Sequence, residues 1–341
     1  MSESDLAARL EGLSGAIFPA YVLYAAVDLG VFEQLRVPCT VPELAQRSRA
    51  TVDGTLRLVR ALAALDLVRV EGGVVAAAPG ALELLGAGAR SVAPVLRHHR
   101  HQLAPLLARL PAALRGEGSQ LAAWEFARSP PAESAYLELA RHPEQLEDFL
   151  LAMDHASRGV GADLAARVEL REVRRMVDLG CGGGVVAREL LAACPELRIE
   201  SFDLAEAAER ARDASTRAGL EARHVVRAGD LLSGVAARDA DAALLSAVLA
   251  TWGPAERARI LATALEVLAP GGLLVVSETL LDDDALGPPK AAMFSLLMLL
   301  AMRGDQLGAA QLTRELLAAG FEAPTVLRGG PRDVVLARKP R

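Results

Sequence analysis

The spacing of apolar residues changes once along the chain. Up to about Arg171 the apolar positions recur with helical spacing, with a short interruption near residue 70. From Arg174 onward, short apolar runs alternate with helical segments. Strands that alternate with helices in this way form a mainly parallel sheet with helices on both faces. The pattern therefore predicts a mainly helical first half and a doubly wound α/β second half.

The second half is predicted to hold a sheet that ends in an antiparallel strand. The helices expected between its strands are Val185 to Cys194, Ala205 to Ala218, Pro254 to Leu268 and Thr313 to Ala319. The expected strands are Arg175 to Leu179, Ile199 to Asp203, His224 to Arg227, Ala240 to Leu245 and Gly272 to Glu278, with a final pair near Thr325 to Leu327 and Val334 to Ala337.

The first apolar segment, Leu13 to Leu29, has almost no polar face. A helix that is apolar all round is buried on every side, so we expect this one to pack into a partner subunit. Thr40, with Glu43 three residues later, is typical of a helix N-terminus, and Thr51 to Leu65 follows as a second helix. Further helical segments are expected over Ala81 to Leu114 and Ser134 to Ala166, with interruptions at Pro130-Pro131 and Pro143.

A small hairpin is predicted after the second helix, from Leu67 to Val70 and Val74 to Ala77, joined at Gly72 and Gly73. Two helices followed by a hairpin are typical of a winged helix. A DNA-reading helix would need a basic face, whereas Thr51 to Leu65 offers only Arg57 and Arg60. We therefore favour packing or dimerisation over DNA binding for this part.

Composition indicates an ordinary globular protein of about two domains. The chain has 341 residues, of which 52% are hydrophobic and 23% charged. Its three cysteines have no metal-like spacing, which fits a reducing, cytoplasmic location. The net charge of −6 gives no attraction to nucleic acid, and the purest apolar run, Leu296 to Met302, is too short to span a bilayer. We expect no nucleic-acid partner and no membrane contact.

The segment from Met176 to Gly184 is a buried strand that runs into glycines and then a helix. Such glycines let the backbone touch a ligand at the carboxyl end of a sheet. A dinucleotide fingerprint needs Gly or Ala five positions after its first glycine, but counting from Gly180 gives Val185. Asp203 can accept both ribose hydroxyls of an adenosine. Asp230, after the third strand, can accept the adenine amino group, which favours S-adenosylmethionine over a dinucleotide.

These motifs resemble those of class I methyltransferases of the small-molecule O-methyltransferase family, which includes plant phenolic, acetylserotonin and bacterial polyketide enzymes. The resemblance extends over almost the whole chain. It implies a winged-helix dimerisation domain over residues 1–105, a helical linker and substrate-pocket region over 106–170, and a Rossmann-like methyltransferase domain over 171–341, in a homodimer. The segments that carry it are Phe149 to Arg158, Val177 to Gly184, Phe202 to Leu204, Gly229 to Asp230, Pro270 to Gly272, Ser277 to Glu278 and Ala319 to Phe321.

The resemblance also implies a site for S-adenosylmethionine. Two serine hydroxyls are placed at its methionyl end, and ordinary local hydrogen bonding is the alternative role for each of them. The implied contacts are Gly180 and Gly182 along the methionyl part, Asp203 at the ribose, Asp230, Leu204 and Leu231 around adenine, and Ser157 and Ser246 at the methionyl end, with Asp178 as a further cofactor-binding residue.

The chain departs from the family at the general base. Many relatives carry His-Asp-Trp after the fourth strand, and here Ala250 stands at the histidine position. Glu278, which braces that histidine in relatives, is present with nothing to brace. A base supplies about 10² to 10⁴ in rate, whereas proximity and orientation contribute roughly 7–11 kcal/mol, so methyl transfer without a base is the leading hypothesis.

Two alternatives to methyl transfer remain open. In the first, S-adenosylmethionine stays bound as a fixed positive charge in a cyclase-like or hydroxylase-like enzyme of secondary metabolism. In the second, more remote one, the chain is a winged-helix DNA-binding regulator.

His155 is the best substitute for the lost base, and together with Glu278 it forms the expected catalytic set. The alternative for His155 is a hydrogen-bonded histidine on a helix packing face. His98, His99 and His101 lack both the helical spacing and the carboxylate of a metal site, so we expect no metal.

By the same resemblance, the acceptor pocket lies between the domains. Aromatic and methionine side chains suit a flat, polyketide-like substrate. Phe294 and Met298, four residues apart, could equally be core. The expected lining is Phe18, Tyr21, Phe126, Met153, Trp252, Phe294 and Met298.

Overall fold

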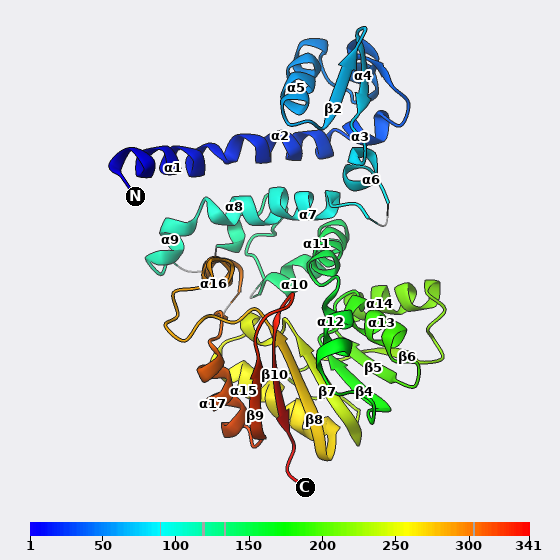
Figure 1. The fold of residues 1–341 in the computed structure, drawn as a ribbon, viewed down its shortest axis with the longest axis vertical. Coiled ribbons are helices and arrows are strands. Elements are labelled where there is room, and N and C mark those ends of the chain that lie inside the picture. Colours follow the sequence, from blue (N-terminus) through cyan, green and yellow to red (C-terminus); the bar gives the residue numbers. More distant parts are fainter. Residues whose placement is uncertain (89, 118–119, 133, 303) are drawn as a thin grey trace. The chain divides into compact units, whose positions relative to one another are not determined.

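The computed structural model describes residues 1–88, 90–117, 120–132, 134–302 and 304–341. The chain separates into two compact units, Met1–Pro105 and Leu106–Arg341 (Figure 1). The first is mainly helical with a small sheet, and the second is built around a large sheet. The predicted fold class, a helical part followed by a doubly wound α/β part, is confirmed.

Unit 1 contains the predicted helices and hairpin. Strands β1 (Cys39–Thr40), β2 (Val68–Glu71) and β3 (Val74–Ala77) form an antiparallel sheet in the order β1-β3-β2. The capping box is confirmed, since the Thr40 amide donates to Glu43 Oε2 at 2.7 Å. The helices are α1 (Glu3–Gly15), α2 (Ile17–Asp28), α3 (Val31–Gln34), α4 (Val41–Arg47), α5 (Val52–Ala64), α6 (Ala81–Leu85) and α7 (Ala93–His98), followed by the π-helical turn η1 (His99–Leu103). The next helix, α8 (Ala104–Leu107), contains the boundary between the two units.

The apolar N-terminal segment is not buried by its own chain. No residue of α1 and only Ala26 of α2 is buried, and Phe18 is 75% exposed. The apolar surface that the helix leaves exposed in the single chain is compatible with the expected packing into a partner subunit, which stays a prediction. The stretch Glu3–Asp28 contains a window of mean hydropathy 1.4 and is long and apolar enough to cross a membrane by length and composition only. A single N-terminal helix of this kind is weak evidence for a membrane segment, so the expected absence of membrane contact stays a prediction.

The regions predicted to be helical, Ala81 to Leu114 and Ser134 to Ala166, consist of several short helices, and one of them begins at Pro143, where an interruption was expected. Proline at the first turn of a helix lacks only an amide that has no helical partner there, but it cannot continue a helix that precedes it. Pro94, Pro111 and Pro143 occupy such first-turn positions. The resulting helices are α9 (Leu110–Leu114), η2 (Leu121–Ala123), α10 (Ala135–Ala140), α11 (Pro143–Ala156) and α12 (Val160–Arg167).

The large sheet has seven strands in the order β6-β5-β4-β7-β8-β10-β9. Neighbours from β6 to β8 pair in parallel, whereas β10 is antiparallel to both β8 and β9. The predicted antiparallel end of the sheet is thus confirmed. The bounds are β4 (Arg175–Leu179), β5 (Arg198–Asp203), β6 (His224–Ala228), β7 (Ala240–Ser246), β8 (Leu268–Glu278), β9 (Glu322–Leu327) and β10 (Asp333–Arg338).

Helices cover both faces of this sheet. Side chains of α12 and α13 (Val185–Ala193) form one apolar core with the strands, and those of α15 (Pro254–Val267) and α17 (Ala309–Ala318) form the other (Figure 1). Helix α14 (Ala205–Arg217) packs beside β6. A separate core around Trp124, Leu139 and Leu300 joins α10 to α16 (Pro289–Ala301).

Candidate functional site

The candidate site lies where the strand order reverses. From β4 the chain proceeds through β5 to β6 on one side, and then returns to place β7 on the other side of β4. Ligands of open α/β sheets bind in the crevice at the carboxyl ends of strands at this point. Asp178 pairs with Leu244 across β4 and β7, so the register places Gly180 beside Ser246 at that edge.

The glycine loop after β4 leaves no room for a side chain at Gly180 and Gly183, whereas the space beside Gly182 is open. Gly180 has φ +83°, and a Cβ there would lie 2.7 Å from Cγ2 of Val248. At Gly183 a Cβ would lie 2.6 Å from Cγ of Asp154, which belongs to α11. The backbone of the loop is therefore the surface that a ligand would meet. A cradle of this kind fits the nucleoside and methionyl parts of S-adenosylmethionine.

Asp203, the last residue of β5, is oriented by the loop. Its Oδ2 accepts from the Gly182 amide and its Oδ1 from the Leu204 amide, each at 2.7 Å. Burial raises the pKa of the Asp203 carboxyl, and the two amides lower it. Each carboxylate oxygen keeps a lone pair free, so both can still accept from the hydroxyls of a ribose.

The residues predicted for adenine lie beside this carboxylate in different environments. Leu204 is 38% exposed, and Cδ1 of Leu231 lies 3.5 Å from the position of a Cβ on Gly180. Asp230 is exposed and closes its own turn, accepting from the Leu232 amide at 2.9 Å and the Ser233 hydroxyl at 2.7 Å. Leu204 and Leu231 thus offer apolar surface near the loop, as an adenine ring requires.

Asp178 lies beneath the loop, where it takes part in a buried polar chain. The Ser201 hydroxyl donates to its Oδ2 at 3.2 Å and lies 2.8 Å from Nε2 of His224, whose Nδ1 lies 2.5 Å from the Ser215 hydroxyl. Burial raises the pKa of Asp178 to about 7 and lowers that of His224 to about 4. The hydrogen bond that Asp178 accepts from Ser201 joins β4 to β5 just before the loop, and its direct contact with a cofactor stays a prediction.

Ser157 and Ser246, predicted for the methionyl end, are brought together by a residue that the sequence analysis missed. The Arg332 guanidinium donates through Nη2 to Ser157 Oγ and through Nη1 to Ser246 Oγ, each at 2.8 Å. Arg332 precedes β10, more than eighty residues after Ser246. No local motif marks it, because its role depends on the loop between the last two strands.

The Glu278 carboxylate accepts hydrogen bonds from the backbone at the missing histidine position, which corrects the expectation that it has no partner there. Its Oε1 accepts from the Leu249 amide at 2.8 Å and from the Ala250 amide at 3.4 Å. Both amides belong to the turn η3 (Leu249–Thr251), which carries the missing histidine position. Burial raises the pKa of Glu278 and Arg332 lowers it. The carboxylate thus holds the backbone of this turn, which sequence comparison at the histidine position could not reveal.

His155 lies in the last turn of α11 and is partly buried. Its Nδ1 is buried and has no hydrogen-bond partner among the described residues. Burial lowers the pKa of the imidazole, and the nearby Arg158 lowers it further. A neutral histidine with a free ring nitrogen can accept a proton, so the role of His155 as a base stays a prediction.

Tyr136 is a second residue missed by the sequence analysis. Its hydroxyl hydrogen-bonds with Thr251, and its ring lies 6.2 Å from that of Trp252. Burial raises the pKa of Tyr136 to about 12, with Asp203 and Glu278 adding to the rise. The phenol is therefore neutral and acts as a donor. The sequence could not indicate this role, because α10 lies many residues before the sheet and contains no motif.

The predicted acceptor-pocket residues fall in both units. Phe18 and Tyr21 are exposed on α2 in unit 1. In unit 2, Phe126 stacks on Trp124 with ring centroids 5.0 Å apart, and Met153 and Trp252 are partly buried. Phe294 and Met298 are partly exposed on α16, whose core contacts come from Leu297, Leu300 and Ala301. Whether these two residues line a pocket or belong to the core stays a prediction.

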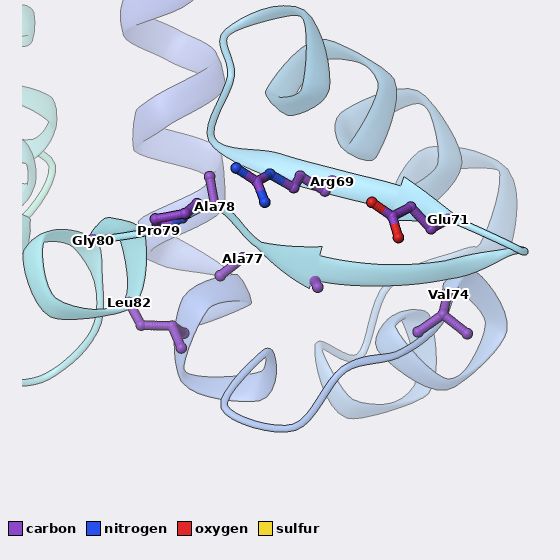
Figure 2. A pocket seen from close by; sticks show the side chains of 9 residues that line it. Arg69, Glu71, Val74, Ala77, Ala78, Pro79, Gly80 and Leu82 are labelled. Carbon is purple, nitrogen blue, oxygen red and sulfur yellow. The ribbon is translucent and has the colours of Figure 1, made fainter.

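Unit 1 has a hollow of its own, lined by residues of that unit alone. It has a volume of about 540 Å³ and lies over the β2–β3 hairpin (Figure 2). Arg69 and Glu71 project on the same face of β2, and the remaining lining is small or apolar. Their opposite charges and the lack of a nucleophile or aromatic platform give this hollow no evident chemistry.

The histidines of unit 1 are engaged in local contacts. Nδ1 of His98 lies 2.7 Å from Oε1 of Gln102, and Nε2 of His101 lies 3.2 Å from Oδ1 of Asp28. Within the described ranges no three His, Cys, Asp or Glu side chains gather as metal ligands. The expected absence of a metal stays a prediction.

Comparison with known proteins gives two family matches. The O-methyltransferase dimerisation domain matches residues 10–85, and the O-methyltransferase domain matches residues 103–322. The tetracenomycin polyketide synthesis 8-O-methyl transferase TcmO of Streptomyces glaucescens is 31% identical over 336 residues, covering 96% of each chain. The 3-hydroxy-5-methyl-1-naphthoate 3-O-methyltransferase of Streptomyces sahachiroi is 30% identical, covering 94% of this chain and 90% of that one.

A solved structure agrees with these matches. The structure of human N-acetylserotonin methyltransferase in complex with SAM superimposes with a TM-score of 0.87 at 26% identity, covering all of both chains. The likeness therefore extends over both units of this chain.

Proposed function

Because this chain belongs to the O-methyltransferase family and is an S-adenosylmethionine-dependent methyltransferase, we propose that it methylates a small natural-product intermediate, with the cofactor at the carboxyl edge of β4, β5 and β7. The observation that carries the proposal is the oriented Asp203 carboxylate against the Gly180–Gly184 loop. S-adenosylmethionine supplies an electrophilic methyl group on a sulfonium.

The residues proposed to hold the cofactor act through backbone and carboxylate contacts. Asp203 accepts from the ribose hydroxyls, while Leu204 and Leu231 offer apolar surface to adenine. Asp230 would accept from the adenine amino group beside or in place of its two local hydrogen bonds, which come from the Leu232 amide and the Ser233 hydroxyl. Gly180 and Gly182 let the methionyl chain pass close to the loop.

We propose an aromatic, polyketide-like acceptor with O-methylation. Trp252 and Tyr136 form adjacent aromatic surface near Glu278, and Phe294 and Met298 remain partly exposed. Flat rings stack well on such side chains. The naphthoate and tetracenomycin names of the two bacterial relatives support the same class of acceptor.

The chemistry proposed relies on position more than on a base. Ala250 offers no acceptor, Glu278 is committed to two amides, and Tyr136 is a neutral donor. Ionising a phenol of pKa about 10 at neutral pH costs roughly 4 kcal/mol, less than the 7–11 kcal/mol that alignment can contribute. His155 could remove the proton where the acceptor is less acidic.

The proposed enzyme is a cytoplasmic homodimer. It has no nucleic-acid or membrane partner. Phe18 and Ile17 expose an apolar surface on α2 that a second subunit would cover, and the dimerisation-domain match includes this helix. One apolar helical stretch in such a domain does not indicate a membrane protein. Of the two basic side chains on α5, Arg57 is already paired with Asp53 at 2.8 Å, which weakens any DNA-binding face.

Incubation with methyl-labelled S-adenosylmethionine and a hydroxynaphthoate or related polyketide phenol tests the proposal. We expect one S-adenosylhomocysteine per labelled product. Asp203→Asn should weaken cofactor binding, whereas Asp213→Asn, an exposed aspartate on α14, should not. Product formed without S-adenosylhomocysteine would replace methyl transfer by the electrostatic alternative, and equal affinity in the two variants would remove Asp203 from the site.

A further inference from the structure

Arg332 is a charged side chain that reaches the carboxyl end of β7, where it hydrogen-bonds to Ser246, and the end of α11, where it hydrogen-bonds to Ser157. It is partly buried, and the hydrogen bonds described for its guanidinium go to two neutral hydroxyls, Ser157 and Ser246. Burial lowers the pKa of the guanidinium, but an arginine stays charged under all ordinary conditions. A desolvated cation without a carboxylate bound directly to it is costly unless an anion completes its environment.

The loop that presents Arg332 is held in place by a second arginine. Arg167 of α12 pairs with Asp163 at 2.9 Å and donates to several carbonyl groups of the loop. At Gly330, which has φ +79°, a Cβ would lie 2.6 Å from Nη1 of Arg167. The carbonyls that accept from Arg167 are those of Leu327 at 3.0 Å, Arg328 at 3.1 Å, Gly329 at 2.6 Å and Arg332 at 3.3 Å.

Asp333 fixes the other side of the same loop. Its Oδ1 accepts from the Gly329 amide at 2.9 Å, and its Oδ2 accepts from Arg328 at 3.1 Å and from the Leu280 amide at 3.3 Å. The backbone before and after Arg332 is therefore determined by ion pairs and hydrogen bonds. An arginine presented this rigidly loses little conformational freedom when it binds an anion.

The surroundings of Arg332 identify the anion. Ser246 ends β7 beside Gly180, and Ser157 follows α11, whose Asp154 lies against Gly183. Both hydroxyls therefore border the glycine loop. Glu278 is the charged group that acts on Arg332, and its Oε1 is engaged by the Leu249 and Ala250 amides. A planar guanidinium flanked by hydroxyls matches a carboxylate, which it can bind through two parallel hydrogen bonds.

We propose that Arg332 binds the α-carboxylate of the methionyl group of the cofactor, replacing its present hydrogen bonds to Ser157 and Ser246 and freeing those hydroxyls to contact the same group. This inference rests on the proposed cofactor site. It makes Arg332 a binding and specificity residue that selects S-adenosylmethionine and S-adenosylhomocysteine over nucleosides without the amino-acid carboxylate.

Calorimetric titration with S-adenosylmethionine and with decarboxylated S-adenosylmethionine tests the assignment, because the two probes differ in that carboxylate. We expect Arg332→Gln to weaken S-adenosylmethionine binding by about 10- to 100-fold, and to change the affinity for the decarboxylated probe by less than about threefold. Arg338→Gln, at the exposed far end of β10, should leave both affinities unchanged. Arg332→Lys keeps the charge and loses the two-pronged geometry, so it should weaken only S-adenosylmethionine, to a smaller extent.

The other outcomes overturn the proposal. An equal loss of affinity for both probes would show that Arg332 only links Ser157 to Ser246 and does not bind the carboxylate. Unchanged affinity for both probes would show that Arg332 has no role in cofactor binding. If Arg332→Gln does not fold, the lysine variant decides in the same way. Wild-type protein that binds neither probe would instead remove the cofactor site itself, and that result differs from all those above.

Discussion

Replacing Glu278 separates its structural role from a catalytic one. Its Oε1 accepts from two buried amides, one at 2.8 Å and one at 3.4 Å, of which the second is at the limit of a hydrogen bond. A buried donor left without an acceptor costs about 1–3 kcal/mol. With one full and one weak bond, Glu278→Ala should lower the free energy of unfolding by about 2–4 kcal/mol. Glu278→Gln keeps a carbonyl oxygen and should stay within about 1 kcal/mol of wild type.

Urea unfolding measures these differences, with Glu266→Ala as the control. Glu266 is an exposed carboxylate paired with Arg238, and its loss should cost less than about 1 kcal/mol. Activity supplies the second readout. If Glu278 acts through the backbone of η3, Glu278→Gln keeps kcat/KM and its pH profile. Equal destabilisation in the glutamine and alanine variants would refute the capping argument, and a stable glutamine variant with an altered pH profile would give Glu278 a role in proton transfer.

Three further results are expected. Gly183→Ala should weaken cofactor binding and lower stability, because the added methyl group meets the Asp154 carboxylate. A second substitution, Asp154→Ala, should restore part of both. A calorimetric titration with S-adenosylmethionine that is unchanged by Gly183→Ala would contradict the tight packing of the loop. Burial raises the pKa of Asp178 from its ordinary 3.8 to about 7, so the folded state binds this proton more tightly than the unfolded state does. The resulting contribution to the free energy of unfolding is present below about pH 4 and is lost as the pH rises to 7. Asp178→Asn should remove that loss in unfolding curves measured across this pH range, and a pH dependence unchanged by the substitution would refute the argument. Phe18→Glu should shift the sedimentation of the protein from dimer to monomer, and a persistent dimer would place the interface elsewhere.

Local chemistry in the sequence predicted the second half of the chain well. Short apolar runs separated by helical segments predict β4, β5 and β7, and the glycines after Leu179 predict the loop that follows β4. Because these strands are parallel, the pattern alone places Asp203 and Gly180 at the same edge of the sheet. The helices from Ala81 to Leu114 were less predictable, because Pro94 and Pro111 are compatible with both the start and the interior of a helical pattern.

Residues that reach the site from distant elements could not be found from spacing alone. Arg332 depends on the packing of the β9–β10 loop against Arg167, and Tyr136 depends on where α10 lies beside η3. The role of Glu278 was misjudged because its partners are backbone amides, which no sequence motif reports. Long-range tertiary contacts, rather than local propensity, determine all three.

The position of β10 has a consequence for how this protein is made. This strand follows β9 in the chain but lies between β8 and β9 in the sheet, and hydrogen bonds continue to Lys339, whose amide donates to the Gly272 carbonyl at 3.0 Å. During synthesis on the ribosome, the edge of β8 that pairs with β10 therefore stays without that partner until residues 333–339 have been synthesised. A stop codon that removes this strand should yield an aggregating product, because the edge of β8 then stays unpaired.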